Sequence, residues 1–528
     1  MRVSTGQYFA NSLTSYSSNF AAVTKTQEQI SSGTRIQTAA DDPVGAAKLL
    51  KLQQQSSLLE QYSGNITTIN NSLNNEESIL SSVTDSLQRA RELALEAGNG
   101  GLSDEDRASI ASEIGQIEET VYGLLNSKDS NGNYIFAGSQ STTQPYVRNS
   151  DGTYTYQGDQ TQLSLQVSDT LSIATNDTGY SIFETATNVA RTETTQTGPT
   201  NSSGVVTDDG LMSVSAGTLS SKTSYNNTYT AGEPYTLKFT SSTEFTLTDA
   251  NGNDVTGETS SGGIIDPDDE AGTTISFRGV DYAVNVSLTE EQADSADSLI
   301  AGHTYTLAST PDTITANRIS SNTSTAQITG GSISDASDYA AGFPEGGAVI
   351  KFTSATEYEV YASPSTDSSK AVASGTLTGS SITAAGVSFD VSGTPAAGDQ
   401  FNVSANSHQS QNVLNTLAQL KAALNTPTTD SASSLAVTNA VAAAIGNLDS
   451  AATQIDITRG SIGARGNALE IQSGENSSLS LANASTQSSI ADTDVAEASV
   501  QLTLQQTMLQ AAQLAFSRIS QLSLFDKL

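Results

Sequence analysis

The chain has 528 residues, of which 36% are hydrophobic and 6% aromatic, so it is long enough for several domains but has few apolar side chains. Its 22 Lys and Arg against 56 Asp and Glu give a formal charge of -34. Such a surface repels phosphate backbones and anionic lipids, so we expect neither nucleic acid nor a membrane as a partner. Because the chain has no Cys, it can form no disulfide and no thiolate metal site.

The N-terminal segment carries apolar residues at a seven-residue spacing. The repeat is formed by Phe9, Tyr16, Val23 and Ile30, with Leu13, Phe20 and Gln27 interleaved between them. This spacing predicts a helix with one narrow apolar face, as in a coiled coil. Gly33 interrupts the pattern, and Asp42 followed by Pro43 predicts the start of a second helix.

A longer repeat follows and predicts a rod-like helix. It consists of Leu52, Leu59, Ile66, Leu73, Leu80, Leu87 and Ala94. Glycines at 98–101 end it, and Ser103 with Asp106 forms the pattern of a capping box that opens another helix. We expect these two helices to lie antiparallel as a hairpin.

The C-terminal segment mirrors this arrangement. A short helix is expected around 413–424, and a longer one carries Val441, Leu448, Ile455, Ile462 and Leu469 at seven-residue spacing. Gly460, Gly463 and Gly466 weaken the longer helix locally. A last helix, capped near Asp492 or Thr493, presents Val495, Leu502, Leu509 and Phe516, with Ala498, Ala512 and Ile519 beside them.

The middle of the chain alternates apolar and polar residues with the period of β-strands, and it contains a repeat. The segment LKFTSSTEF at 237–245 returns as IKFTSATEY at 350–358, and GVDY at 279–282 is echoed by GVSF at 386–389. These echoes predict two copies of one β module.

Together the patterns predict an α+β multidomain chain. Its N- and C-terminal helices are expected to pair into a coiled-coil-like helical rod, with a central β-rich insert of two repeated modules. We expect a terminal helical assembly domain (1–43 with 488–528), a helical rod domain (44–145 with 406–487) and a β-rich outer insert (146–405).

No pattern in the sequence nominates a catalytic, cofactor-binding or metal-binding residue. His303 and His408 stand outside any cluster of carboxylates, and we expect both to be exposed. The runs at 129–133 and 249–253 imitate the start of a calcium loop but lack its Gly at the sixth place and its Glu at the twelfth. We interpret both as Asn-Gly turns, and we expect no enzyme activity and no cofactor.

The two terminal repeats are the most informative feature. We predict an assembly interface formed by Phe9, Leu13, Tyr16, Phe20, Val23, Ile30, Val495, Leu502, Leu509, Phe516 and Ile519. In one interpretation the two helices simply pack on each other within the chain. In the other, their narrow faces bury too little area alone, so they become ordered only when identical or related subunits pack alongside.

Several stretches resemble the flagellins and their hook-associated relatives. Residues 30–36 (ISSGTRI) followed by 39–43 (AADDP) are similar to the N-terminal signature of that family, and 132–138 (GNYIFAG) resembles the hairpin that follows. Residues 490–497 (IADTDVAE) and 519–522 (ISQL) resemble its C-terminal end. The resemblance covers the two ends of the chain and leaves out the middle.

Within the family, residues 1–5, 89–95 and 522–528 look more like the hook-associated branch than filament flagellin. That resemblance implies a self-associating ring at the junction of hook and filament, with hook-associated protein 1 and flagellin as partners. It also implies secretion by the flagellar type III apparatus without a cleavable signal peptide, and an export chaperone on the C-terminal helix. Residues 1–9 do not read as a signal peptide. The alternatives are a filament flagellin or, more distantly, a secreted β-rich adhesin.

Overall fold

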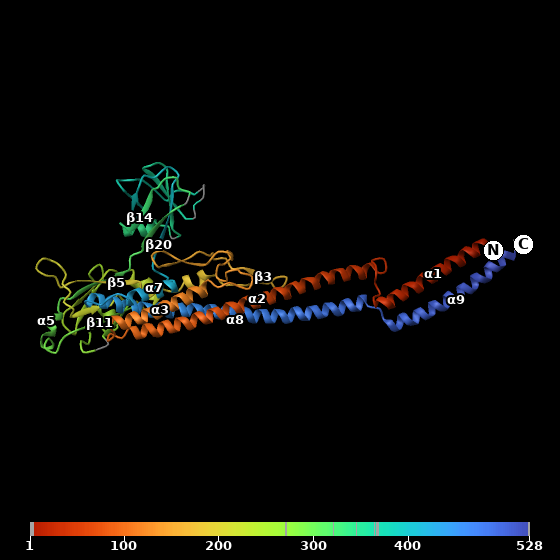
Figure 1. Ribbon diagram of the computed structural model, residues 1–528, viewed down its shortest axis with the longest axis horizontal. Coiled ribbons are helices and arrows are strands. Elements are labelled where there is room, and N and C mark those ends of the chain that lie inside the picture. Colours follow the sequence, from red (N-terminus) through yellow and green to blue (C-terminus); the bar gives the residue numbers. More distant parts are fainter. Residues whose placement is uncertain are drawn as a thin grey trace. The chain divides into compact units, whose positions relative to one another are not determined.

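In the computed structural model, long helices form both ends of the chain and strands form its middle (Figure 1). The structure describes residues 5–269, 272–319, 321–344, 346–363, 365 and 369–525. The α-helices are α1 (Thr5–Ser32), α2 (Pro43–Ala97), α3 (Asp104–Leu125), α4 (Lys222–Ser224), α5 (Ala296–Ile300), α6 (Ala336–Gly342), α7 (Val413–Leu424), α8 (Ser431–Ala491) and α9 (Val495–Phe525). Four short π or 3-10 turns are η1 (Tyr180–Glu184), η2 (Tyr225–Tyr229), η3 (Thr256–Glu258) and η4 (Ala293–Ser295).

The strands are short and pair antiparallel. They are β1 (Tyr146–Arg148), β2 (Tyr154–Tyr156), β3 (Ser164–Gln166), β4 (Ser172–Ala174), β5 (Thr192–Gly198), β6 (Met212–Val214), β7 (Thr218–Leu219), β8 (Tyr235–Phe239), β9 (Phe245–Thr248), β10 (Thr273–Phe277), β11 (Val280–Val286), β12 (Thr304–Ser309), β13 (Thr313–Arg318), β14 (Gln327–Ile333), β15 (Ala348–Phe352), β16 (Glu357–Ala362), β17 (Ala373–Thr376), β18 (Ser381–Ala384), β19 (Val387–Ser392) and β20 (Gln400–Asn406).

The predicted helix starts are confirmed for α2 and α3. Asp42 stands just before α2 and accepts a hydrogen bond from the backbone N–H of Gly45 at 2.9 Å. Ser103 and Asp106 form the predicted capping box at the start of α3. For α9 the predicted cap is wrong by one or two residues, because Asp494 accepts from the N–H groups of residues 496 and 497.

Contacts divide the chain into two compact units, described separately below. The terminal unit comprises residues 1–75, 163–176 and 461–528, and the central unit comprises 76–162 and 177–460. The three-domain division expected from sequence stays a prediction. Residues 163–176, assigned there to the outer insert, belong to the same unit as both chain ends.

In the terminal unit, the first half of α2 packs against the last part of α8. The apolar repeat of α2 faces inward here, with Leu59, Ile66 and Leu73 buried. Polar side chains also cross the interface, since Asn483 of α8 donates to the backbone oxygen of Leu52 at 2.8 Å. The β3–β4 hairpin is held on the helices by Asn476, which donates to the backbone oxygen of Val167 at 3.0 Å.

In the central unit, the rest of α2 packs with α3, α7 and the first part of α8. Arg89 of α2 donates to Glu113 of α3 at 2.8 Å, as expected of the predicted antiparallel hairpin. The buried Glu118 of α3 accepts hydrogen bonds from Lys421 of α7, from Arg148 of β1 and from Tyr154 of β2. One carboxylate therefore joins two helices and a hairpin that are far apart in sequence.

The middle of the chain holds two β modules of the same topology, which confirms the predicted duplication. Module 2 (313–406) is one sheet in the order β17-β16-β15-β20-β13-β14-β19-β18. Module 1 (192–309) has sheets β5-β12-β8-β9 and β10-β11-β6. The repeated segments make β8, β9, β10 and β11 equivalent to β15, β16, β18 and β19, so the strand orders agree. The modules differ at three places. β13 pairs with β14, whereas β5 and β6 belong to separate sheets; β17 extends the sheet of module 2 beyond β16; and β7 pairs with β11 in module 1.

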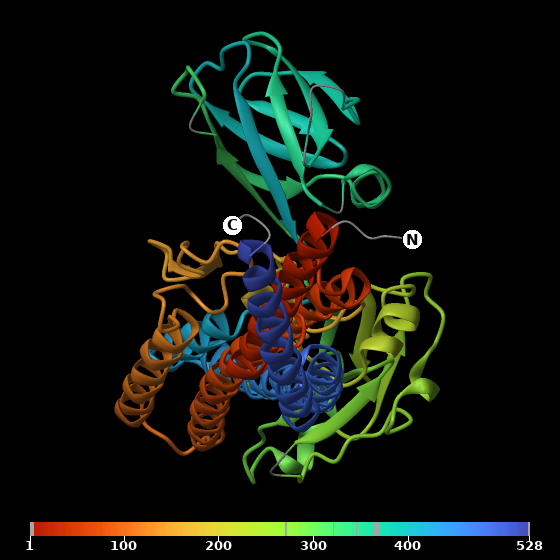
Figure 2. The same cartoon turned by 90° about the vertical axis from the view of Figure 1, so that its right-hand side faces the viewer.

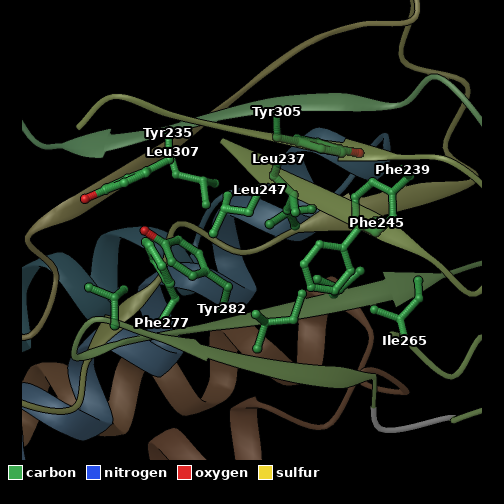
Figure 3. Packing of buried hydrophobic residues seen from close by; sticks show 14 of the residues in the cluster. Tyr235, Leu237, Phe239, Phe245, Leu247, Ile265, Phe277, Tyr282, Tyr305 and Leu307 are labelled. Carbon is green, nitrogen blue, oxygen red and sulfur yellow. The ribbon is translucent and has the colours of Figure 1, made fainter. Parts of the chain in front are cut away.

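The hydrogen bonds of the two modules also repeat. Gly279 and Gly386 both have positive φ (86° and 76°), and each backbone oxygen accepts from the N–H of a serine, Ser220 or Ser334. A Cβ at either glycine would lie within 2.5 Å of a backbone atom, so only glycine fits. The core of module 1 lies between its sheets, where Phe239 and Phe245 pack with ring centroids 5.9 Å apart (Figure 3).

Candidate assembly interface

Helices α1 and α9 lie side by side and antiparallel in the terminal unit (Figures 1 and 2). Their adjoining ends are joined by backbone contacts: Thr34 and Asp492 form an isolated β-bridge, and Thr493 donates to the oxygen of Gly33 at 2.9 Å. The first and last helices of the chain thus pair with each other, as the fold class predicts.

Six residues of each helix form the paired face, alternating at spacings of three and four. On α1 these are Ser12, Tyr16, Asn19, Val23, Thr26 and Ile30, and on α9 they are Ala498, Leu502, Gln505, Leu509, Ala512 and Phe516; all are buried or half-buried. The rings of Tyr16 and Phe516 stack across this face with centroids 6.4 Å apart. The face therefore includes six residues of the predicted interface, namely Tyr16, Val23, Ile30, Leu502, Leu509 and Phe516.

The paired face contains one buried polar contact. Thr26 is only 4% exposed, and its hydroxyl donates to the side-chain oxygen of Gln505 at 2.8 Å. A buried hydrogen bond of this kind favours one register, because any slip leaves both groups unpaired. Sequence reasoning missed this pair, and only the small polar residues at the three-residue offset could have signalled it.

Leu13, Phe20 and Gln27 do not belong to the buried row of α1 that faces α9, although the ring of Phe20 stacks on that of Tyr16 with centroids 6.5 Å apart. Leu13 is 48% exposed and Phe20 55% exposed, and Gln27 is exposed as well. The residues one position earlier, Ser12, Asn19 and Thr26, lie on the paired face instead. A seven-residue repeat allows its second row to lie either three or four residues on, and burial here selects three.

The remaining predicted interface residues lie elsewhere or cannot be placed. Val495, the first residue of α9, is exposed. The side chains of Phe9 and Ile519 lie outside the part of the chain that the structure describes.

Both helices also carry exposed apolar side chains outside the buried rows of the paired face. We call Leu13, Phe20, Val500, Leu504, Met508 and Leu514 the outward apolar residues, and each is about half exposed or more. Val500, Leu504 and Met508 are four residues apart and so form one stripe. Clustered apolar residues on a surface are typical of a protein-protein interface.

The charge of these helices differs from that of the whole chain. Lys25 and Glu28 are the charged residues of α1, and Glu497 and Arg518 are those of α9, so the pair is neutral although the chain carries -34. Lys25 lies 2.7 Å from Asp41, and this ion pair, with hydrogen bonds from Thr38, holds the pKa of Asp41 well below its usual value. Copies of the helix pair can therefore approach each other without strong repulsion.

Features that would point to other functions are weak. Among the described residues, no three His, Asp or Glu side chains are grouped as metal ligands would be. Within that same part of the chain, no helix has the length and hydropathy needed to cross a bilayer. The run at 249–253 is a turn, as interpreted, because the carboxylate of Asp249 accepts from the N–H groups of Asn251 and Asn253.

The prediction for His303 is wrong, and His408 is half-buried. His303 is fully buried at the start of β12, where its ring contacts Asp209, a residue far away in sequence. A polar histidine is expected at the surface only when the protein interior offers its ring no hydrogen-bond partner.

Comparison with known proteins decides the family. Residues 3–141 match the model of the bacterial flagellin N-terminal helical region, and residues 445–528 match that of the C-terminal helical region. The two ends of the chain are those of the flagellin family. Members of this family are structural proteins of the flagellum and not enzymes.

Among curated flagellin relatives, the chain is 35% identical to flagellar hook-associated protein 3 of Salmonella typhimurium over 190 residues, which is 36% of this chain and 59% of that protein. It is also 35% identical to the Escherichia coli protein of that name over 193 residues, 37% of this chain and 60% of the relative. Bacillus subtilis flagellin is 35% identical over 141 residues, 26% of this chain and 46% of the relative. The matches thus span less than two thirds of these relatives.

Solved structures of flagellin relatives also align. Flagellar hook associated protein-3 from Legionella pneumophila is 24% identical, and the alignment covers 83% of this chain and 98% of that one with a TM-score of 0.45. The flagellar junction protein FlgL from the same organism is 24% identical, with coverages of 84% and 100% and a TM-score of 0.43.

Proposed function

We propose that this chain is the subunit that joins the flagellar hook to the flagellin filament. The observation that carries the proposal is the sequence match to hook-associated protein 3, which extends over 190 residues, compared with 141 for the Bacillus subtilis flagellin. The neutral pair of terminal helices with its outward apolar residues supports a role in assembly.

In this proposal, subunits pack their terminal helices together in a ring. The outward apolar residues of one copy meet helices of the next copy, of hook-associated protein 1 on the hook side or of flagellin on the filament side. Burying these side chains stabilises the ring by the hydrophobic effect. The paired face, including Tyr16 and Phe516, sets the spacing of the two helices within each subunit. The predicted interface thus becomes two surfaces, one within a subunit and one between subunits.

Secretion without a signal peptide, through the flagellar export apparatus, fits a chain that needs no disulfide to refold. An export chaperone would cover the outward stripe of α9 before assembly. That stripe is apolar and would otherwise promote premature association.

A filament flagellin is the second candidate, since flagellins match the same two ends of the chain. Immunogold labelling of intact flagella separates the two. A single band at the distal end of the hook supports the junction, whereas labelling along the whole filament supports a flagellin. A screen for glycan binding tests the more distant adhesin alternative.

The direct test is deletion of the gene followed by complementation. The deletion should leave intact hooks without filaments and release flagellin monomers into the medium. The wild-type gene should restore filaments, whereas Leu504→Asp should not, because it places a charge where a neighbouring subunit packs. The matched control is Val205→Asp, an equally exposed valine in a loop of module 1, which should restore filaments fully. Filaments in the deletion strain would refute the proposal.

A further inference from the structure

The buried His303 of module 1 occupies a position that the duplication allows us to compare. The N–H of Phe239 donates to the oxygen of His303, and the N–H of Gly302 donates to the oxygen of Phe239, both at 2.9 Å. In module 2, Phe352, Asp399 and Gly398 make the same two bonds. His303 and Asp399 therefore hold equivalent places, one residue before β12 and β20.

Both side chains hold the loop that connects the equivalent strand pairs. Asp399 accepts from the N–H of Thr323 at 3.0 Å and from the hydroxyl of Ser324, in the loop between β13 and β14. The ring of His303 contacts Asp209, in the loop between β5 and β6. The carboxylate of Asp399 accepts these hydrogen bonds without an added proton. The ring of His303 faces a carboxylate, so a hydrogen bond between them needs a proton.

The contacts of the two ring nitrogens of His303 show how many protons the ring and Asp209 must carry between them. Nδ1 of His303 lies 2.9 Å from the backbone oxygen of Ile300, and since a carbonyl can only accept, Nδ1 must carry a hydrogen. In the neutral ring Nε2 then has only a lone pair. It lies 3.1 Å from Oδ1 of Asp209, which as a carboxylate is also an acceptor. Two acceptors repel at this distance, so the contact requires one further proton, on Nε2 or on Asp209.

The other titratable groups near the ring do not supply this proton. Asp208 accepts from the hydroxyl of Ser431 at 2.9 Å, and Tyr305 of β12 donates to the oxygen of Met212 at 3.0 Å. Asp297 of α5 accepts from Ser242, and the side chain of Lys238 on β8 is exposed. The positive charge of an imidazolium would meet only acidic neighbours on the loop.

We propose that a proton shared by His303 and Asp209 holds the β5–β6 loop (199–211) on module 1, and that its loss at higher pH releases the loop. The same loop carries the exposed Val205 and Val206 at its tip and contacts Ser431 at the start of α8 through Asp208. Release therefore loosens both an apolar surface and one tether between module 1 and α8.

Hydrogen exchange of the full-length protein, followed by mass spectrometry, tests whether the His303–Asp209 contact holds the β5–β6 loop. Protection factors of the loop, corrected for the pH dependence of intrinsic exchange, are compared at pH 5.5 and 8.5. The wild-type loop should lose protection roughly tenfold or more at the higher pH, equivalent to breaking one charged hydrogen bond. The segment around Thr323 and Ser324 is the internal control and should not change.

The Asp209→Asn variant sharpens the test. Its side-chain amide can donate to the bare Nε2 of a neutral ring, so its loop should stay protected at both pH values. The ring is observed directly by ¹⁵N NMR of histidine-labelled protein, with His408→Asn assigning the second signal; Asn suits the positive φ of position 408. At pH 5.5 the Nδ1 signal should be that of a protonated nitrogen. A bare Nδ1, equal protection of the wild-type loop at both pH values, or an Asp209→Asn loop that opens as the wild type does would each overturn the proposal.

Discussion

Replacing Glu118 with Gln should destabilise the central unit. The carboxylate is 1% exposed and accepts hydrogen bonds from Lys421, from Arg148 at 2.7 Å and from Tyr154 at 2.6 Å. Burial alone would raise the pKa of Glu118, but the bonds from these three residues outweigh it and hold the pKa below its usual value. The ionised form is therefore the one that the fold stabilises.

The size of the effect follows from the partners that remain. A glutamine keeps one acceptor oxygen but turns its amide hydrogens toward Lys421, which is also a donor. Removing one partner of a buried ion pair costs about 3–5 kcal/mol. Because the side chains of Lys421 and Arg148 are more than one-third exposed and can be hydrated, we expect about 2–4 kcal/mol.

The assay is urea denaturation of the full-length protein followed by far-UV circular dichroism. The matched control is Glu119→Gln, whose carboxylate also pairs with Arg148, at 2.6 Å, but is 53% exposed. The control should cost less than about 1 kcal/mol. Since the folded-state pKa of Glu118 is lowered, its stabilisation is present above the usual pKa of Glu and is lost as pH falls below it, so the two variants should converge in acid. Equal costs at pH 7 would refute this reasoning.

Four further predictions address other parts of the chain. Phe516→Asp should abolish incorporation into the flagellum and loosen the α1–α9 pair, because it places a charge against the ring of Tyr16; α-helical circular dichroism should be lost at a lower temperature than in the wild type, and an unchanged melting curve would contradict this. Burial raises the pKa of Glu184 to about 7, so its carboxyl lowers stability by about 3 kcal/mol as pH rises from 4.5 through 7, and urea titrations should show a flatter pH dependence for Glu184→Gln. Gly463→Ala should raise stability by about 0.5–1 kcal/mol in the same assay, because its Cβ meets open space. Gly446→Ala should lower stability, since its Cβ would lie 2.6 Å from Val189.

The sequence predicts the helices of this protein well because their signals are local. The apolar repeats, the capping box at Ser103 and the Asp42-Pro43 start all act within a few residues, and the structure confirms them. The β duplication was also visible, since the repeated segments carry the turns and core strands of each copy. The strand order was not, because antiparallel neighbours such as β13 and β20 are joined by pairings of residues far apart in the chain.

The candidate interface shows where local signals end. Periodicity predicts that Tyr16, Val23 and Ile30 share a face, but it allows the second row to lie three or four residues on. The larger side chains at Leu13 and Phe20 favour four, whereas the packed pair uses three and places Thr26 against Gln505. Which row is buried depends on the partner helix, whose Gln505 lies 479 residues from Thr26 along the chain. The sequence of α1 alone therefore does not predict it.

The burial of His303 likewise depends on the fold and not on the local sequence. By itself a histidine is polar and belongs at the surface. The fold brings Asp209 and the oxygen of Ile300 to its two nitrogens, and these partners offset the cost of removing the ring from water. The repeats therefore determined the helical ends and the repeated β modules, and the motifs near the two ends of the chain indicated the family. Only the tertiary structure decided which side chains are satisfied inside, because hydrogen-bond partners are supplied by segments that the sequence keeps apart.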